Sequence, residues 1–280
     1  MHLGITGGSS LTGSSIAAFF HRKDWKVSAL FTKPSLADYS PLQRQRIEKL
    51  PCDLCYGIRV EDDSCTQWIR KHQPDLWIHH HHYMEDFRSK AYDYHRANAV
   101  CIEPLERIVD ALDSSGCKRI IYSGTYFEEP RHERIEEFYP YVVSKLQVWA
   151  ELLALCAKRD INIGKVVIPN VVDPFENRDR ALPDFYGHVV EGREFQLHSP
   201  DNIIDSLPAD HLAQTYFDTA LQLTKVKILI DKPSGWRGTM IDWLQFANSE
   251  IAKRLDVPLV KIKQPSHQAV ATSYFNTDDI

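Results

Sequence analysis

Short apolar runs alternate with longer amphipathic segments over the first 170 residues of the chain. Short runs of branched and aromatic residues are typical of strands, and longer segments with apolar residues three or four apart are typical of helices. Strands that alternate with helices form right-handed βαβ units, which build a parallel sheet. The pattern therefore predicts an α/β fold with a doubly wound parallel sheet. We expect strands at 2–6, 27–31, 76–80, 119–123 and 162–168, and helices at 14–21, 64–71, 97–114 and 141–158.

The pattern changes after residue 170. Loop-like segments at 177–183 and 198–202 are rich in Pro, Asp, Asn and Arg. A helix at 209–222, a strand at 226–230 and a last helix at 241–255 follow. We expect residues 1–170 to form one domain, and residues 171–280 to form mainly a smaller, discontinuous part that is interleaved with the last strands of the sheet.

Composition and charge exclude several classes of protein. The chain has 280 residues, of which 43% are hydrophobic and 25% charged, and its net charge is −5. These values are typical of a soluble globular protein without the basic excess of a nucleic-acid binder. No apolar run approaches the roughly 20 residues that cross a membrane, and the N-terminus lacks the charged start of a signal peptide. Six cysteines without compact spacing indicate reduced thiols and a cytoplasmic location.

A glycine-rich segment follows the first expected strand and reads Thr6-Gly7-Gly8-Ser9-Ser10-Leu11-Thr12-Gly13. Between a strand and a helix, such a turn brings backbone N–H groups and the helix N-terminus to a pyrophosphate. The middle position of a G-x-x-G-x-x-G spacing holds Ser10, whose hydroxyl could itself bond a phosphate. The alternative is a plain strand-to-helix turn. In a nucleotide-binding turn, the contact residues would be Gly7, Ser9, Ser10, Leu11 and Gly13.

The second expected strand ends in Thr32-Lys33-Pro34-Ser35. An acidic residue after this strand usually holds the ribose 2′-hydroxyl of NAD, whereas a basic residue accommodates the 2′-phosphate of NADP. Lys33 is present here and an acid is not. The segment therefore favours NADP as the cofactor, with NAD as the alternative, unless Lys33 is an ordinary surface lysine.

Tyr141 and Lys145 lie four residues apart on the expected helix at 141–158, and Ser123 ends the strand before it. Residues four apart share one helix face, so a phenol and an ammonium would lie side by side. A nearby cation stabilises a phenolate and lowers the pKa of a tyrosine. Tyr141 is therefore a candidate proton donor and acceptor for interconversion of an alcohol and a ketone.

These motifs together resemble the extended short-chain dehydrogenase/reductase family, which contains nucleotide-sugar epimerases, dehydratases and reductases. The resemblance spans residues 1–215, with further motif-like segments at 52–54, 74–79, 122–127 and 169–174. It implies a Rossmann-type sheet that binds NAD(P) within residues 1–170. It also implies a catalytic set of Ser123, Tyr141, Lys145 and Asn98. Further implied cofactor contacts are Asp53, Leu54, His79, His80, His81, Pro169, Asn170 and Val171, together with Tyr141 and Lys145.

The chain departs from the family pattern at Ser10, at Ile168, where the family has Arg, and at two further places that bear on the chemistry. His79-His80-His81-His82 stands where family members usually read H-L-A-A. In a strand these side chains would alternate between the faces, so at most two would converge, and we expect no metal site. Gly124 and Thr125 occupy the positions where the sugar 4,6-dehydratases carry an Asp-Glu pair. Dehydration is therefore disfavoured.

The resemblance implies an NAD(P)-dependent reductase or epimerase with a small-molecule substrate, such as a nucleotide-activated sugar or deoxysugar. We expect residues 171–280 to bind mainly the substrate, and family members often form homodimers through the helix at 141–158. The alternative is a catalytically drifted NAD(P)-binding sensor or interaction protein, which Ser10 and the four histidines favour. For an enzyme, the expected substrate contacts are Thr125, Asn170, Arg178 and Arg180.

Overall fold

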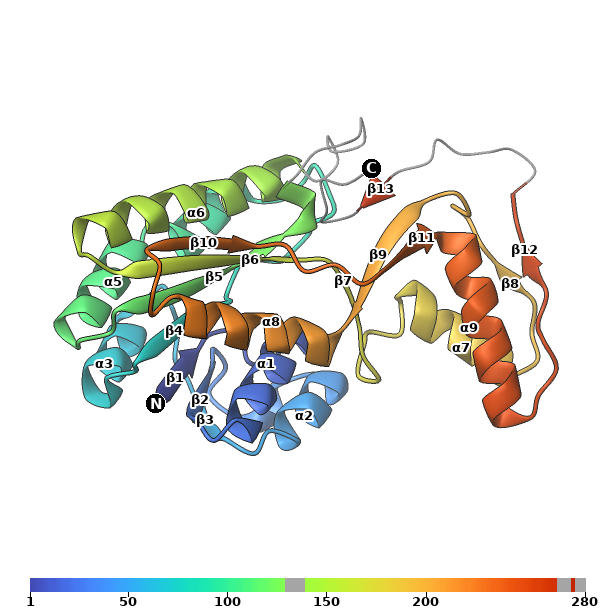
Figure 1. Cartoon of the computed structure of the whole chain (residues 1–280), viewed down its shortest axis with the longest axis horizontal. Helices are drawn as coiled ribbons and strands as arrows, with labels where there is room; N and C mark the ends of the chain where they lie inside the picture. Colours follow the sequence, from blue (N-terminus) through green and yellow to red (C-terminus); the bar gives the residue numbers. More distant parts are fainter. Residues whose placement is uncertain (129–138, 266–272, 275–280) are drawn as a thin grey trace.

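Seven parallel strands form the central sheet of the computed structural model, which describes residues 1–128, 139–265 and 273–274 (Figure 1). The strand order is β10-β6-β5-β4-β1-β2-β3. The prediction of a doubly wound, Rossmann-type α/β fold is confirmed. The strands are β1 (His2–Ile5), β2 (Lys26–Phe31), β3 (Asp53–Tyr56), β4 (Leu76–His79), β5 (Arg119–Thr125), β6 (Asn162–Ile168) and β10 (Ile228–Asp231).

Two hydrophobic cores lie on the two faces of this sheet. On one face, Ile78 and Ile121 pack with apolar residues of α1 (Leu11–Arg22) and α8 (Ala209–Gln222). On the other face, their strand neighbours Trp77 and Tyr122 point the opposite way, because side chains alternate along a strand. The helices of this second face include α3 (Asp63–His72), α5 (Leu105–Ser114) and α6 (Tyr139–Lys158).

The helix expected at 97–114 is in fact two helices, α4 (Tyr94–Cys101) and α5. Pro104 lies between them at the start of α5. Proline has no backbone N–H and disfavours a helical conformation in the residue before it, so a continuous helix is broken there. Most other predicted elements are present with small shifts at their ends. The elements of the first half that the pattern did not predict are η1 (Leu36–Asp38), α2 (Pro41–Glu48), β3 and η2 (Tyr126–Glu128).

A smaller group of elements extends from the carboxyl ends of β5 and β6 (Figure 1). A helix, α7 (Ala181–Val190), begins inside the segment that we expected to be a loop at 177–183. This helix packs with α9 (Met240–Leu255) in a third apolar cluster. The strands are β7 (Asn170–Val172), β9 (Ile203–Pro208), β11 (Trp236–Thr239) and β13 (Ser273–Tyr274) in one sheet, and β8 (Phe195–Gln196) with β12 (Ile262–Lys263) in another.

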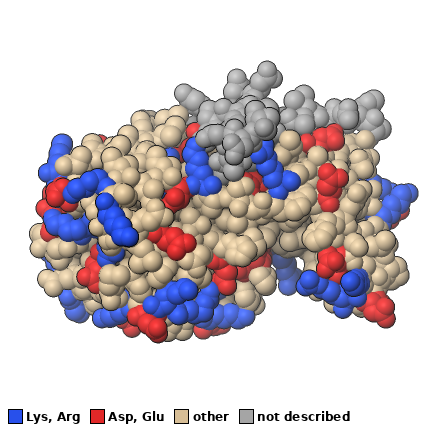
Figure 2. Space-filling model, viewed as in Figure 1, with Lys and Arg blue, Asp and Glu red and all other residues tan. Residues whose placement is uncertain are grey.

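Acidic and basic side chains are interspersed over the face shown in Figure 2, in keeping with the small net charge. Within the described residues, no helix combines the length and apolar character that crossing a membrane requires.

Candidate active site

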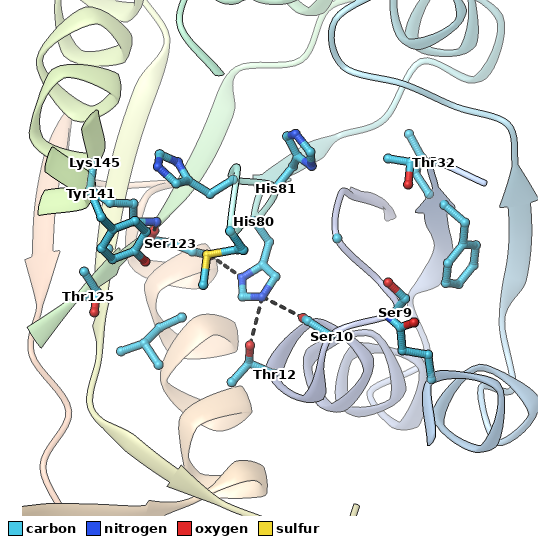
Figure 3. Close-up of a pocket in the computed structure, with 18 residues that line it drawn as sticks. Ser9, Ser10, Thr12, Thr32, His80, His81, Ser123, Thr125, Tyr141 and Lys145 are labelled. Atoms are coloured by element: carbon cyan, nitrogen blue, oxygen red, sulfur yellow. Dashed lines mark hydrogen bonds between the residues drawn. The ribbon is translucent and has the colours of Figure 1, made fainter. Parts of the chain in front are cut away.

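A cavity of about 430 Å³ lies at the carboxyl ends of the central strands (Figure 3). Ligands of open α/β sheets bind at this edge. Its lining runs from Thr32 after β2, across the turn after β1, to Tyr141 and Lys145 on α6. Thr125, at the end of β5, also contributes to the lining. The structure therefore brings the turn and the Tyr-Lys pair, which are far apart in sequence, to one cavity.

The glycine-rich turn is shaped for an anion. Gly7 has a φ of +71°, which favours glycine, and Gly7, Ser9 and Ser10 line the cavity. A Cβ atom at Gly13 would lie 2.3 Å from the carbonyl oxygen of Gly7, so a side chain there would push the helix and the turn apart. Helix α1 has no acidic residue in its first turn, and Leu11 begins it. These residues fit a dinucleotide pyrophosphate at a helix N-terminus.

Tyr141 and Lys145 are both buried, with relative exposures of 5% and 4%. The Lys145 Nζ donates to the carbonyl oxygen of Ser123 at 2.5 Å. Burial lowers the pKa of Lys145 to about 8 and raises the pKa of Tyr141 well above its usual range. The ring of Tyr141 packs edge-on against Phe87 and His82. The pair thus forms one wall of the cavity, with the phenol and the ammonium both shielded from solvent.

A network of hydrogen bonds holds the Ser123 hydroxyl. Tyr216 of α8 donates to the Ser123 Oγ at 2.7 Å, and the His80 Nδ1 lies 2.6 Å from the same oxygen. The His80 Nε2 lies 3.0 Å from the Ser10 Oγ and 2.8 Å from the Thr12 Oγ1 (Figure 3). Burial lowers the pKa of His80 to about 3, so the ring is neutral. A neutral ring satisfies these contacts if Nε2 carries its proton and Ser123 donates to Nδ1.

The four histidines do not alternate as a strand would require. Strand β4 ends at His79, and His80, His81 and His82 all line the cavity. His79 is buried, and its ring nitrogens have no hydrogen-bond partner in the part of the chain that the structure describes. Burial lowers the pKa of His79 to about 3 and that of His81 to about 4. Among the described residues, no three His, Cys, Asp or Glu side chains form a group that could hold a metal ion.

A second cavity of about 340 Å³ lies between η2, the segment after β6, and the helices α7 and α9. The Arg180 guanidinium lines it, donating to the Asn170 Oδ1 at 2.5 Å and to the Glu176 Oε1 at 3.0 Å. Trp243 and Tyr126 add aromatic surface to the same cavity. An arginine beside aromatic rings is suited to a ligand with both anionic and planar groups.

The NAD dependent epimerase/dehydratase family matches residues 3–213 of the chain. The chain belongs to this family. The predicted family resemblance is thereby confirmed. The match also agrees with the predicted class of enzyme and with a nicotinamide-dinucleotide cofactor.

Solved structures of nucleotide-sugar epimerases share the fold across nearly the whole chain. The UDP-glucose 4-epimerase of Thermus thermophilus, in complex with NAD, has a TM-score of 0.72 and 17% identity, and the match covers 98% of this chain and 90% of that one. The UDP-glucose 4-epimerase of Thermotoga maritima, with UDP-glucose, has a TM-score of 0.74 and 15% identity, and the match covers 99% of this chain and 90% of that one. The UDP-glucuronic acid 4-epimerase of Bacillus cereus, with UDP-glucuronic acid and NAD, has a TM-score of 0.72 and 16% identity, and the match covers 99% of this chain and 88% of that one. No curated protein matches the chain in sequence.

Several residues that the family register selects lie away from the first cavity. Asp53 and Leu54 open β3, where Asp53 pairs in register with Ser28, so they lie at the amino end of the strand. The cavity is at the carboxyl end, which β3 reaches with Tyr56. The structure therefore does not bring Asp53 or Leu54 to it. Asn98 is also outside the lining, and its side chain donates to Glu103.

The remaining predicted residues divide between the cavities, the buried interior, which holds Pro169 and Val171, and the surface. Asn170 lines the second cavity, whereas its neighbours Pro169 and Val171 line neither. Arg178 is exposed and lines neither, unlike Arg180. Lys33 is exposed next to Thr32, and its Nζ donates to the carbonyl oxygen of Asp38 at 2.6 Å. Sequence reasoning missed Tyr216 and His82, because their part in the site depends on tertiary contacts of α8 and of the chain after β4.

Proposed function

We propose that this protein is an NAD(P)-dependent oxidoreductase or epimerase that acts at a carbinol or carbonyl carbon of a nucleotide-activated sugar or deoxysugar. The observation that carries this proposal is that Tyr141 and Lys145 line the same cavity as the glycine-rich turn. A proton-transfer pair beside a dinucleotide-binding turn is the arrangement that hydride transfer to or from a carbinol carbon requires.

The chain's own residues would divide the work as follows. The nicotinamide cofactor, when bound at Gly7, Ser9, Ser10 and the N-terminus of α1, supplies the hydride chemistry. Tyr141 exchanges the proton of the substrate hydroxyl, and the charge of Lys145 acts against the rise in the pKa of Tyr141 that burial causes. Because Tyr216 donates to the Ser123 oxygen, the single proton of Ser123 faces the His80 Nδ1, and it must turn away from His80 to reach the substrate. That proton can bond the substrate oxygen and polarise a carbonyl.

The second cavity supports a nucleotide sugar as the substrate. Arg180, Asn170 and Trp243 line this cavity with a guanidinium that is paired with Glu176, an amide and an aromatic ring. Solved relatives hold UDP-glucose or UDP-glucuronic acid. We assign substrate binding mainly to residues 171–280, with Thr125 at the end of the first cavity. Gly124 and Thr125 provide no carboxylate, so dehydration stays disfavoured. A cytoplasmic homodimer is part of the same proposal.

Binding of the cofactor is the first test. Purified protein is expected to enhance the fluorescence of NADPH and to gain thermal stability with NADPH or NADP. Ligand at 100 times its Kd adds about 2.7 kcal/mol to the free energy of unfolding, which raises Tm measurably. If folded protein binds neither NADP(H) nor NAD(H), the enzyme proposal is wrong. A panel of nucleotide sugars then identifies the substrate. Consumption of NADPH reports reduction, and formation of the epimer, followed by NMR, reports epimerisation, which regenerates the cofactor.

We propose that the protein prefers NADP over NAD, and that Lys33 provides this preference. The described residues that line this end of the cavity are Leu30, Phe31, Thr32 and Gln43, and none of them is a carboxylate. Lys33→Glu is expected to raise the Kd for NADP relative to the Kd for NAD by on the order of tenfold, which corresponds to about 1.4 kcal/mol of binding free energy. Lys26→Glu, at the opposite end of β2, is the control and should leave the ratio unchanged. An unchanged ratio in Lys33→Glu would show that Lys33 is an ordinary surface lysine.

One observation favours a second candidate, a protein that binds NAD(P) without turnover. The Ser123 hydroxyl is already bound by His80, and His80 also bridges Ser10 and Thr12 over the turn. Cofactor binding with neither consumption of NADPH nor formation of an epimer on any substrate of the panel would favour this candidate.

A further inference from the structure

A buried ion pair lies outside the groups that the proposed chemistry uses. Glu128 of η2 and Lys165 of β6 form a salt bridge, and their side chains are 1% and 9% exposed. An ion pair between a sheet and a helix is weak evidence for stability, because removing both charges from water opposes their attraction. The role of the pair therefore depends on what it contacts in the neighbouring site.

The pair lies directly behind the end of β5. The Glu128 Oε1 accepts a hydrogen bond from the backbone N–H of Thr125 at 2.8 Å. A Cβ atom at Gly124 would lie 2.7 Å from the Lys165 Cε and 3.1 Å from the Glu128 Oε1. Ser123, one residue earlier, accepts from Lys145 through its carbonyl oxygen. Residues 123–125 of β5 thus connect the ion pair to Lys145, because the ion pair contacts one end of this segment and Lys145 contacts the other.

Lys145 and Lys165 place two buried ammonium groups beside the end of β5, and Glu128 is paired with Lys165. The Lys145 Nζ lies 4.7 Å from the ring centroid of Tyr122, and the Lys165 Nζ lies 5.5 Å from that of Trp149. The two rings are stacked, with centroids 6.2 Å apart. Both ammonium groups therefore face the same aromatic layer between the sheet and α6, and Glu128 supplies the negative charge beside them.

We propose that Glu128 is a positioning residue of the active site, which acts as the shared counter-charge of Lys145 and Lys165 and anchors the turn that carries Thr125. The proposal rests on the proposed function for the role of Lys145. Lys165 holds the carboxylate in place, and the glycine at 124 leaves room for both side chains.

The electrostatics of Lys145 agree with this geometry. Burial lowers the pKa of Lys145 to about 8, the charge of Glu128 is the largest effect that opposes burial, and the charge of Lys165 adds a smaller lowering. Without the carboxylate, Lys145 would lose its proton at a lower pH. The titratable groups that face Lys145 are the histidines at 79–82, Cys101, Tyr122, Glu128, Tyr141 and Lys165.

A direct titration of Lys145 tests the proposal. In protein labelled with ¹³C at the lysine ε-carbon, the Lys145 resonance is assigned by its loss in Lys145→Met. We expect a midpoint near pH 8 in the parent protein. In Glu128→Gln the midpoint should fall by on the order of one pH unit. Glu176→Gln removes another buried, paired carboxylate, which lines the second cavity, and should leave the midpoint unchanged.

The direction in which the Lys145 midpoint moves distinguishes loss of the Glu128 charge from entry of water into the site. If Glu128→Gln merely admitted water, the midpoint would rise toward the ordinary lysine value, and a rise or no change overturns the proposal. If this variant does not fold, Glu128→Gln combined with Lys165→Met removes both members of the salt bridge, and the midpoint of Lys145 should also fall because Glu128 has a larger effect than Lys165. No turnover is needed for this measurement. A failed substrate screen would therefore reject the proposed function and leave the result for Glu128 standing.

Discussion

Replacing Tyr141 with phenylalanine is expected to reduce kcat by about 10²–10⁴-fold, which is the usual contribution of a positioned acid–base group. The substitution removes one oxygen and keeps the ring, whose contacts with His82, Phe87 and Tyr92 hold it in place. The cavity should therefore keep its shape, and the Kd for NADPH should stay within about threefold. Steady-state kinetics with the identified substrate, together with NADPH fluorescence titration, measure the two quantities.

Tyr92→Phe is the matched control for this experiment. Tyr92 is a buried tyrosine whose ring lies 5.9 Å from that of Tyr141, and its hydroxyl donates to the carbonyl oxygen of Tyr83. It does not line the cavity. Loss of its hydroxyl should leave kcat close to the parent value. Equal turnover by Tyr141→Phe and the parent protein would refute the role of Tyr141 and leave the fold and the cofactor proposal intact.

Local patterns predicted the elements that carry the site. The turn at 7–13 and the pair Tyr141 and Lys145 each lie within a short segment, where the spacing of residues determines which backbone or helix face they share. The alternation of strands and helices then places both segments at the carboxyl edge of one parallel sheet. The turn and the Tyr-Lys pair, together with the predicted fold class, were therefore sufficient to predict that both segments lie at one cavity.

Contacts between distant segments could not be predicted in this way. His80 meets Ser123 and Tyr216 through the packing of β4, β5 and α8, and Glu128 meets Lys165 across β5 and β6. No local spacing signals either set. The helix break at Pro104 differs, because proline marks such breaks locally and the pattern of apolar residues obscured it.

Gly13→Ala is expected to prevent cofactor binding and to lower the free energy of unfolding. The added methyl carbon would lie 2.3 Å from the carbonyl oxygen of Gly7 and 2.9 Å from the Ser10 Oγ. The first contact is with backbone, so no side-chain rotation relieves it, and α1 must move away from the turn. Overpacking of this kind costs about 1–3 kcal/mol, and the displaced helix N-terminus no longer faces a pyrophosphate. Urea unfolding and NADPH fluorescence measure the two effects.

Gly187→Ala separates this clash from the general effect of alanine in a helix. Gly187 lies inside α7, and a Cβ atom there would meet nothing within 4 Å. Alanine has a helix propensity about 1 kcal/mol more favourable than glycine, so this variant should be as stable as the parent protein or more stable. Gly13→Ala adds the same methyl group to a helix, and the difference between the two variants therefore reports the contact with Gly7. Gly13→Ala could also match Gly187→Ala in stability and still bind NADPH. That result would contradict the close packing of α1 on the turn and the placement of the pyrophosphate there.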